Sequence, residues 1–362
     1  MYKSKNMKIL ITGVGGPTPR SFAIALKKYS SFADAELIAT DINPLSIGLY
    51  QPWLFSKSYV VPRATDPGYW PVIERIVLEN KIDMAVILPE LEVMLWSRRK
   101  QTHPLPCKVL LPDPAIAELL VDKAKMTELL EPLGIVPPSV GFDARESGFD
   151  ALFGKLDLPF WVRSSSGTSG LGSLKVQDEQ SLRNWIQINP GVTNFLASKF
   201  LPGRNLACKM LYFEGRLLRT ACGERVNYIM SIVAPSGITG NTSFGRLLNE
   251  PALVDVAVRA MDHLFGHTGA AKHGFFTADF KEDADGKPYI TEINVRHVAF
   301  TQCFAAAGAN FASDTIRLLA GDTGFDMEYR MYSFEPGTIF LRDVDALPVM
   351  MKESDLLGVQ DA

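Results

Sequence analysis

Cysteine is scarce in this chain, and its few copies lie far apart. The four cysteines are Cys107, Cys208, Cys222 and Cys303, and no two of them form a CxxC pair. Structural zinc sites and disulfide frameworks depend on clustered or paired cysteines, so the sequence indicates neither. Cys107 and Cys303 also lack a paired base, and we interpret both as small buried hydrophobic residues. Reduced thiols are typical of the cytoplasm, which is the expected location.

A long apolar run and a strong excess of either charge are also absent. The apolar stretch from Lys8 to Thr12 stops at glycines, so it predicts a first strand and neither a signal peptide nor a membrane span. We expect a short leader before Met7. The formal net charge of -3 gives no broad electrostatic reason to bind nucleic acid. We therefore expect no nucleic-acid partner and no membrane partner.

Internal repeats, low-complexity tracts and the GKS or GKT signature of a Walker loop are missing as well. The composition is that of an ordinary globular protein, because 47% of the residues are hydrophobic and 21% are charged, which excludes the disordered class. A length of 362 residues allows two or three domains at roughly 100–200 residues each.

Strands alternate with helices over roughly the first hundred residues, which predicts a parallel, doubly wound sheet. The turn GVGGPTPR separates the first strand from a segment with apolar residues at helical spacing. The predicted strands are Lys8 to Thr12, Glu36 to Thr40, Ser58 to Pro62 and Asp83 to Pro89, with an amphipathic helix at Pro71 to Asn80.

The pattern changes in the second half of the chain. One helix is predicted from Ala115 to Leu133, ended by Gly134, with an extended connector at Pro137 and Pro138. Hairpin-like turn signals between the later strands predict an antiparallel sheet. The further elements expected are helices at Ser181 to Ile188 and Ala252 to Gly266, and strands at Asn194 to Leu201, Ala207 to Leu218, Thr220 to Ala234, Gly274 to Phe280 and Pro288 to Arg296.

Oxygen-bearing side chains gather on one predicted hairpin, formed by GFFTADF and PYITEINVR around an Asp-Gly turn. Alternate side chains of a strand share a face, so Glu292, Asn294 and Arg296 emerge together. Asp279, on the neighbouring strand, can face the same side. Oxygen ligands of this kind suit Mg²⁺ or Mn²⁺. A solvated amphipathic strand would show the same alternation and is the alternative.

The segment RSSSGTSGLGS, Arg163 to Ser173, is rich in small residues. Such residues let backbone N–H groups surround an anion, and the preceding strand brings the cation Arg163 to the same place. We predict a mobile flap that covers phosphates. A disordered linker is the alternative that the loop by itself leaves open.

Four segments in order resemble the ATP-grasp superfamily: DKAKMTELLEPLGIVPP, PFWVRSSSGTSGLGSLKV, FLASKFLPGRNLACKMLYFEGRLL and TADFKEDADGKPYITEINVR. Within it, the likeness is to the ATP-binding domains of the carbamoyl phosphate synthetase large chain, and it extends to about Ala320. The resemblance implies an α/β chain with a Rossmann-like pre-ATP-grasp domain at 1–113. An α+β ATP-grasp domain at 114–320 would follow, with a mobile lid subdomain at about 138–198 and a C-terminal segment at 321–362.

The resemblance also implies roles for the matched positions. Asp279, Glu292 and Asn294 match ligands of Mg²⁺. Arg296 matches the residue that stabilises charge on the transferred phosphoryl group or on the bound carboxylate. Residues expected to bind ATP are Lys123, Arg163, Ser165, Ser166, Gly167, Ser169, Gly170, Lys199, Phe200, Leu201 and Asn205. Lys199 and Asn205 stand where the family usually has Glu, which leaves the nucleotide preference open.

The activity implied is that of a carboxylate–amine ligase that forms an amide or peptide bond through an acyl phosphate. Its partners would be small-molecule carboxylate and amine substrates, and a homodimer is left open. Arg225 and Arg246 flank a loop that resembles the segment beside the acceptor site, so both are candidate carboxylate clamps, and Arg246 joins Arg163 and Arg296 as a candidate catalytic residue. Surface solvation of Arg225 and Arg246 is the alternative.

Glu90 and Glu92 follow a predicted strand at the carboxyl edge of the sheet, where they could recognise a substrate amine or simply begin a helix.

Two other functions of the protein are left open by the sequence. The turn GVGGPT followed by Asp41 imitates the dinucleotide fingerprint of a nicotinamide-dependent oxidoreductase, although Thr18 replaces the third glycine. A non-catalytic nucleotide-binding homologue is the other. His263 and His267 are better explained by the dipole of a helix end than by zinc.

Overall fold

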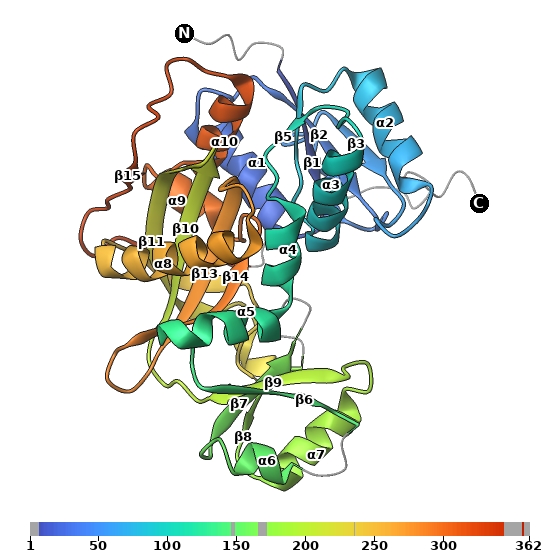
Figure 1. The fold of residues 1–362 in the computed structure, drawn as a ribbon. Helices are drawn as coiled ribbons and strands as arrows, with labels where there is room; N and C mark the ends of the chain where they lie inside the picture. The colour runs from blue at the N-terminus through green and yellow to red at the C-terminus, as the bar shows by residue number, and fades with distance from the viewer. Residues whose placement is uncertain (1–6, 146–148, 166–171, 235, 344–356, 358–362) are drawn as a thin grey trace.

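The computed structural model describes residues 7–145, 149–165, 172–234, 236–343 and 357. The expected leader before Met7 lies outside these residues. Figure 1 shows a parallel sheet in the upper right part of the molecule, a large sheet in the centre and a small sheet at the bottom. Within the described part of the chain, no helix is both long enough and apolar enough to cross a membrane.

The N-terminal part is a parallel sheet covered by helices on both faces. It consists of β1 (Lys8–Thr12), β2 (Glu36–Asp41), β3 (Lys57–Val60), β4 (Met84–Val86), β5 (Lys108–Val109), α1 (Pro17–Tyr29), η1 (Ile47–Tyr50), α2 (Tyr69–Asn80) and α3 (Glu90–Thr102). The strand order β3-β2-β1-β4-β5 confirms the predicted doubly wound sheet. Ile9 of β1 packs in one core with Phe22 of α1, while Leu10 packs in another with Ile73 of α2. Burial on both faces explains why the three central residues of this strand, Ile9 to Ile11, are all apolar.

The central sheet has the strand order β14-β13-β10-β11-β12-β16, and β15 pairs with β11. Its elements are β10 (Asn205–Phe213), β11 (Arg216–Tyr228), η3 (Ser231–Val233), β12 (Thr242–Leu248), β13 (Gly274–Glu282), β14 (Pro288–Asn294), β15 (Arg330–Met331), β16 (Ile339–Leu341), α8 (Pro251–Thr268), α9 (Thr301–Ala306) and α10 (Phe311–Ala320). Met210 packs with Met261 of α8, and Leu211 packs with Phe304 of α9, so helices cover both faces. The prediction that one strand runs from Ala207 to Leu218 is wrong, because Glu214 and Gly215 adopt positive φ and turn the chain into a hairpin.

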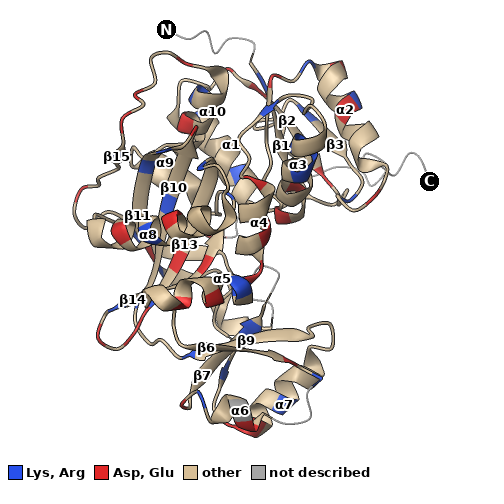
Figure 2. Cartoon of the chain, in the orientation of Figure 1, with Lys and Arg blue, Asp and Glu red and all other residues tan. Residues whose placement is uncertain are grey.

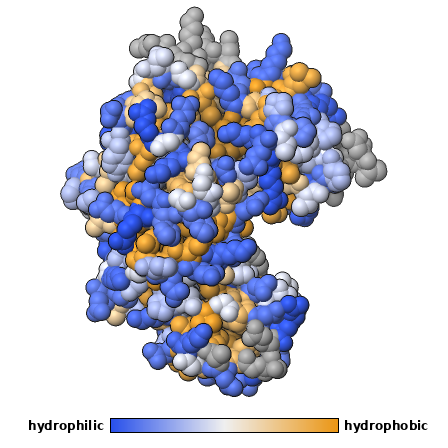
Figure 3. All heavy atoms as spheres, viewed as in Figure 1, coloured by the Kyte–Doolittle hydropathy of each residue, from blue (hydrophilic) through white to orange (hydrophobic). Residues whose placement is uncertain are grey.

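The small sheet has the order β6-β9-β7-β8 and is antiparallel. It consists of β6 (Ser139–Asp143), β7 (Phe160–Ser164), β8 (Leu174–Val176) and β9 (Asn194–Lys199), with helices α6 (Asp150–Phe153) and α7 (Glu179–Ile188). Its own core includes Phe160, Val162 and Phe195. Figure 3 shows a hollow on the right of the molecule between the lobe of this sheet and the N-terminal lobe.

The single helix predicted from Ala115 to Leu133 is in fact broken. The segment forms α4 (Pro114–Val121), α5 (Lys123–Leu130) and the short 3-10 helix η2 (Glu131–Leu133). Asp122 has a non-helical ψ of 94°, and its carboxylate accepts a hydrogen bond from the N–H of Lys125, which caps α5. The N–H of Lys123 is thereby released from α4 and donates to the carbonyl of Ser165 at 3.0 Å. The break therefore brings α5 to the predicted phosphate loop.

The turn after β1 provides a test of the N-terminal fold. Gly13 has a φ of +69°, and a Cβ there would lie 2.4 Å from Cγ of Pro89. We expect Gly13→Ala to lower the free energy of unfolding by about 1–3 kcal/mol, measured by urea denaturation. Gly16→Ala is the matched control, because its Cβ would meet nothing closer than 3.5 Å and no positive φ is required. Equal stability of the two variants would contradict the strain at Gly13.

Candidate active site

The hairpin of β13 and β14 brings together the three side chains predicted as metal ligands. Asp279 pairs with Glu292 across the two strands, and Thr277 pairs with Asn294. Nδ2 of Asn294 lies 3.2 Å from Oδ2 of Asp279 and 3.3 Å from Oε1 of Glu292. A rotation of the amide by 180° would present its oxygen beside the two carboxylates instead. The donor set of two carboxylates and one amide oxygen therefore fits a hard divalent cation.

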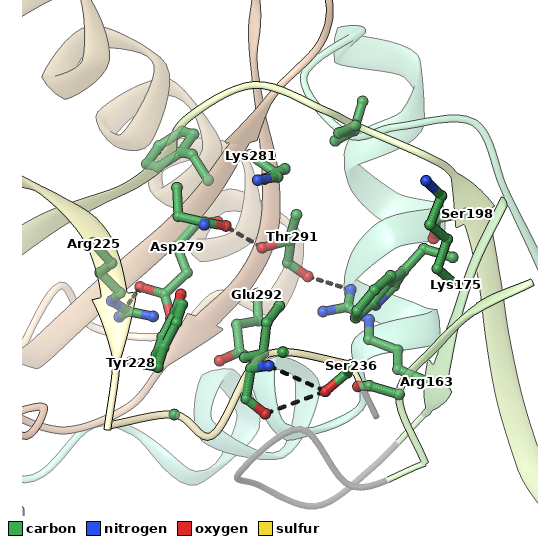
Figure 4. A pocket seen from close by; sticks show the side chains of 18 of the residues that line it. Arg163, Lys175, Ser198, Arg225, Tyr228, Ser236, Asp279, Lys281, Thr291 and Glu292 are labelled. Atoms are coloured by element: carbon green, nitrogen blue, oxygen red, sulfur yellow. Dashed lines mark hydrogen bonds and ion pairs between the residues drawn. The ribbon is translucent and has the colours of Figure 1, made fainter. Parts of the chain in front are cut away.

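Basic side chains surround this group of acids. Arg225 forms a buried ion pair with Asp279, and Nζ of Lys123 lies 3.9 Å from Oε2 of Glu292. Arg163, on β7 of the small sheet, donates a hydrogen bond to the carbonyl of Thr291. Figure 4 shows Arg225 and Arg163 on opposite sides of the two carboxylates, and Figure 2 shows charges of both signs on the strands of the central sheet. Cationic side chains therefore surround the acids of the hairpin.

Three of the surrounding arginines have unused hydrogen-bond donors. The Nε atoms of Arg163, Arg225 and Arg296 are buried, and none has a hydrogen-bond partner among the described residues. Each guanidinium has another nitrogen already bonded: to Thr291, Asp279 and the His297 carbonyl, respectively. Leaving a buried charged donor unpaired is unfavourable. Donors of this kind fit an anionic ligand such as phosphate or carboxylate.

The two carboxylates differ in their protonation. Burial raises the pKa of Asp279 to about 7, with a further contribution from Glu292 and with Arg225 opposing both. Burial also disfavours ionisation of Glu292, but Lys123, Arg163 and Arg225 together outweigh it and lower its pKa. Like charges at short range push two pKa values apart in this way. Glu292 is therefore the carboxylate that carries negative charge most readily.

A cavity of about 720 Å³ extends from the carboxylates between β7 and β9 of the small sheet and β13 of the central sheet. The residues predicted to bind ATP that line it are Lys123, Arg163, Lys199, Phe200, Leu201 and Asn205. Its walls also contain residues that the sequence did not single out, namely Trp161, Lys175, Ser198, Tyr228, Ser236 and Lys281. Alternation along β7 places Trp161 and Arg163 on one face and could have pointed to Trp161.

The predicted phosphate flap is only partly described. Ser165 donates its N–H to the carbonyl of Asn194, and it does not line the cavity. Ser166, Gly167, Ser169 and Gly170 lie outside the described residues. Their expected contact with phosphate stays a prediction.

A second cavity of about 460 Å³ lies on the other side of the carboxylates. Both cavities are lined by Lys123, Arg225, Gly240, Asp279 and Glu292. The second one also includes Asn294, Arg296 and Glu90, together with the turn after β1. The acids of β13 and β14 therefore separate two compartments, one against the small sheet and one against the N-terminal sheet.

Two other candidates lie elsewhere. Arg246 lines neither cavity, and its Nη1 is 2.9 Å from Oε2 of Glu224 on β11, with nearly half of its side chain exposed. Glu92 is only 4% exposed and lines neither cavity. Burial raises the pKa of Glu92 to about 7, opposed by hydrogen bonds with Thr12 and Tyr69. The structure therefore brings Glu90 to a cavity but places Glu92 inside the N-terminal core.

The glycine turn after β1 is occupied by the protein's own groups. Asp41 accepts a hydrogen bond from the N–H of Gly15 at 2.7 Å and another from Oγ of Ser46 at 2.8 Å. Pro17 and Pro19 have no N–H to offer at the start of α1. A dinucleotide site needs free amides for the pyrophosphate and a free acid for the ribose. The structure gives the nicotinamide alternative no support.

Comparisons with known proteins show which proteins this chain resembles in sequence and fold. No family model matches the chain. D-alanine–D-alanine ligase from Neisseria gonorrhoeae (strain NCCP11945) is 25% identical over 214 residues, which cover 57% of this chain and 68% of the ligase. The crystal structure of L-amino acid ligase from Bacillus licheniformis covers 87% of this chain, and 74% of that ligase is matched, with a TM-score of 0.60 and 18% identity.

A third match is the biotin carboxylase domain of 2-oxoglutarate carboxylase from Hydrogenobacter thermophilus, in complex with MgADP, ADP and bicarbonate. It covers 89% of this chain and 71% of that domain, with a TM-score of 0.64 and 15% identity. The parallel sheet, the small sheet and the central sheet occur here in the order expected from the sequence motifs. The chain has the fold of the ATP-grasp ligases, as its motifs predict.

Proposed function

We propose that this protein is an ATP-dependent carboxylate–amine ligase that forms an amide or peptide bond and releases ADP and phosphate. The observation that carries the proposal is the position of Asp279 and Glu292 between two cavities, each large enough for a small molecule. Phosphoryl transfer needs a nucleotide and an acceptor on opposite sides of one charge-neutralising group. The similarity to D-alanine–D-alanine ligase and to L-amino acid ligase supports the same reaction class.

ATP would occupy the larger cavity. Lys199 is the last residue of β9, and Phe200 and Leu201 follow it. These three would contact the base, and Asn205 can hydrogen-bond a ribose hydroxyl. Arg163 and Lys123 would bind the phosphates, since both line the cavity beside the carboxylates. The phosphate flap would cover the phosphates from the small sheet and exclude water.

Asp279, Glu292 and Asn294 would hold Mg²⁺, and Mn²⁺ is the alternative ion because it uses the same oxygen ligands. When bound, the ion supplies neutralisation of the phosphate charge. Arg225 keeps Asp279 fixed through their ion pair. The Nε donors of Arg225 and Arg296 then remain for the anionic substrate.

The acceptor would lie in the second cavity with its carboxylate directed to Arg296. A carboxylate oxygen attacks the γ-phosphorus of ATP, the bond to ADP breaks, and an acyl phosphate forms. The amine substrate then attacks the acyl carbon, phosphate leaves, and the amine loses a proton. Arg296 would stabilise charge on the transferred phosphoryl group. Arg246 is not needed for these steps and stays a candidate only if its pair with Glu224 opens.

The proposal includes the organisation expected from the sequence. The pre-ATP-grasp domain would comprise residues 1–113, the ATP-grasp domain 114–320 with its lid at about 138–198, and the C-terminal segment 321–362. A cytoplasmic location and a homodimer belong to the same proposal, and sedimentation of the purified protein would test the dimer.

Calorimetry tests the nucleotide site directly. We expect ATP to bind the native protein in the presence of Mg²⁺ and to bind at least about tenfold more weakly without it, because the ion offsets repulsion between phosphates and carboxylates. The doubly substituted variant Asp279→Ala, Glu292→Ala should lose the dependence on Mg²⁺. If the native protein binds ATP equally well with and without Mg²⁺, that result would contradict the metal assignment.

Release of ADP distinguishes a ligase from a non-catalytic nucleotide-binding homologue. With Mg-ATP, a panel of carboxylates and hydroxylamine as the amine, a ligase produces ADP and a hydroxamate in equal amounts. Binding of ATP without release of ADP for every carboxylate would favour the non-catalytic homologue.

A further inference from the structure

The second cavity contains charged groups of both signs within one small volume. We infer that the carboxylate substrate is an α-amino acid with an uncharged, apolar side chain, and that Glu90 binds its ammonium group. The inference rests on the proposed ligase function. It goes further in assigning to Glu90 the selection of an amino acid over a simple carboxylic acid.

Glu90 is the first residue of α3, and its side chain lines the second cavity. Its carboxylate accepts no hydrogen bond from any residue that the structure describes. Burial raises the pKa of Glu90, while the charges of Arg296 and Lys123 lower it. A half-buried acid without a direct partner is stabilised by a cationic ligand. An ammonium group is the cation that a small organic substrate can supply.

A second acceptor lies in the same cavity. Oδ1 of Asn241 is buried and has no hydrogen-bond partner among the described residues, and Asn241 lines the cavity. An ammonium group has three N–H donors and therefore needs more than one acceptor. Glu90 and Asn241 together offer the oxygen atoms that such a group requires.

The carboxylate of the substrate has its own binding groups. Arg296 and Arg225 line the same cavity, and each keeps a buried Nε without a partner. Glu90 lines the same cavity as Arg296, and the charge of Arg296 lowers the pKa of Glu90 against the effect of burial. An α-amino acid carries its ammonium and carboxylate groups on the same carbon atom, so its two charges lie close together. A substrate with widely separated charges would not fit this arrangement.

Besides its charged and polar residues, which include Lys123, Asp279, Glu292 and Asn294, the wall of the second cavity has an apolar part. Apolar residues that line the cavity are Leu88, Leu120, Val121, Ile293, Val298 and Ala299. A charged side chain placed against them would lose hydration without gaining a partner. The wall therefore favours a substrate such as leucine over glutamate or lysine.

The test compares leucine with 4-methylpentanoate, which has the same carbon skeleton but no ammonium group. Release of ADP and formation of hydroxamate are measured for both acids, with leucine supplied as both enantiomers, in the native protein, in Glu90→Gln and in the control Glu128→Gln. Glu128 is exposed on α5 and lines neither cavity. Because hydrogen bonds to charged groups are strong, we expect Glu90→Gln to lower kcat/KM for leucine by about 10- to 100-fold.

The expected pattern is specific to the ammonium group. Glu90→Gln should leave kcat/KM for 4-methylpentanoate and KM for ATP unchanged, and Glu128→Gln should behave as the native protein for both acids. Equal use of the two acids by the native protein, or an equal loss for both in Glu90→Gln, would overturn the assignment while leaving the ligase function intact. Preference for glutamate or lysine over leucine would overturn the inference that the side chain of the substrate is apolar.

Failure of the ligase function has a different signature. If no acid supports release of ADP, calorimetric titration of leucine into the native protein and into Glu90→Gln decides the inference by itself. Binding to the native protein that Glu90→Gln loses supports the ammonium site without the reaction. Absence of leucine binding to the native protein rejects the site.

Discussion

Replacement of Glu292 by Gln is expected to lower the rate of ADP formation by at least about 10³-fold. Glu292 faces both cavities, and Lys123, Arg163 and Arg225 keep it ionised. Gln has the same shape but no charge, so it cannot offset a divalent cation against the phosphates. The measurement is the initial rate of ADP release at saturating Mg-ATP with the best carboxylate from the panel.

The control for this variant is a test that it still folds as the native protein does. Circular dichroism and the urea midpoint of Glu292→Gln should stay close to those of the native protein, because the side chain is partly accessible and its size is unchanged. Glu128→Gln again serves as a neutral substitution with the same chemistry. A rate of ADP release equal to that of the native protein would contradict the assignment of Glu292 as a metal ligand.

Replacement of Lys209 by Met is expected to stabilise the protein on the order of 1–4 kcal/mol at pH 7. Lys209 lies on β10 with no exposed surface, and its Nζ has no hydrogen-bond partner among the described residues. The ammonium group faces Phe300 and Phe304 at 4.8 and 4.9 Å from the ring centroids. These rings compensate only part of the lost hydration. Met fills a similar volume without a charge.

The same lysine predicts a pH dependence. Burial, with the charge of Arg225, lowers the pKa of Lys209 from its ordinary 10.5 to about 7, although Asp279 opposes the shift. Between these two values the unfolded chain binds a proton that the folded protein does not. The contribution of Lys209 to stability therefore rises with pH from about 7 to about 10.5, at up to about 1.4 kcal/mol per pH unit. Below pH 7 the full penalty is present.

Urea denaturation at several pH values measures both effects. The difference in free energy of unfolding between Lys209→Met and the native protein should shrink as the pH rises from 7 towards 10. Lys155→Met, at an exposed position of the small-sheet lobe, should show no such trend. A constant difference across this range would mean that Lys209 keeps an ordinary pKa in the folded protein.

The sequence by itself determined the features that depend on local periodicity. Alternation along PYITEINVR placed Glu292 and Asn294 on one face, and the Asp-Gly turn set Asp279 opposite Glu292. Alternating strands and helices predicted the parallel sheet. Both signals are local, because the direction of a side chain along a strand repeats every two residues and a short turn fixes the pairing of its two strands.

Other features carried a local signal that the prediction overlooked. The break at Asp122 could have been anticipated, since an acid that can cap a helix precedes Lys123 and the following turn. The hairpin at Glu214 and Gly215 likewise contains a glycine where φ is positive. In both cases a continuous apolar pattern concealed the boundary of the element.

Only the tertiary structure decided how distant segments meet at the acids. Arg225 belongs to the central sheet and Arg163 to the small sheet, and no spacing in the sequence shows that both lie beside Asp279 and Glu292. The sequence also does not show that Glu90 lines a cavity. Nor does it show that Arg246 pairs with Glu224 outside both cavities. Partners of this kind are set by the packing of whole sheets against one another, which depends on many long-range contacts and leaves no period in the chain.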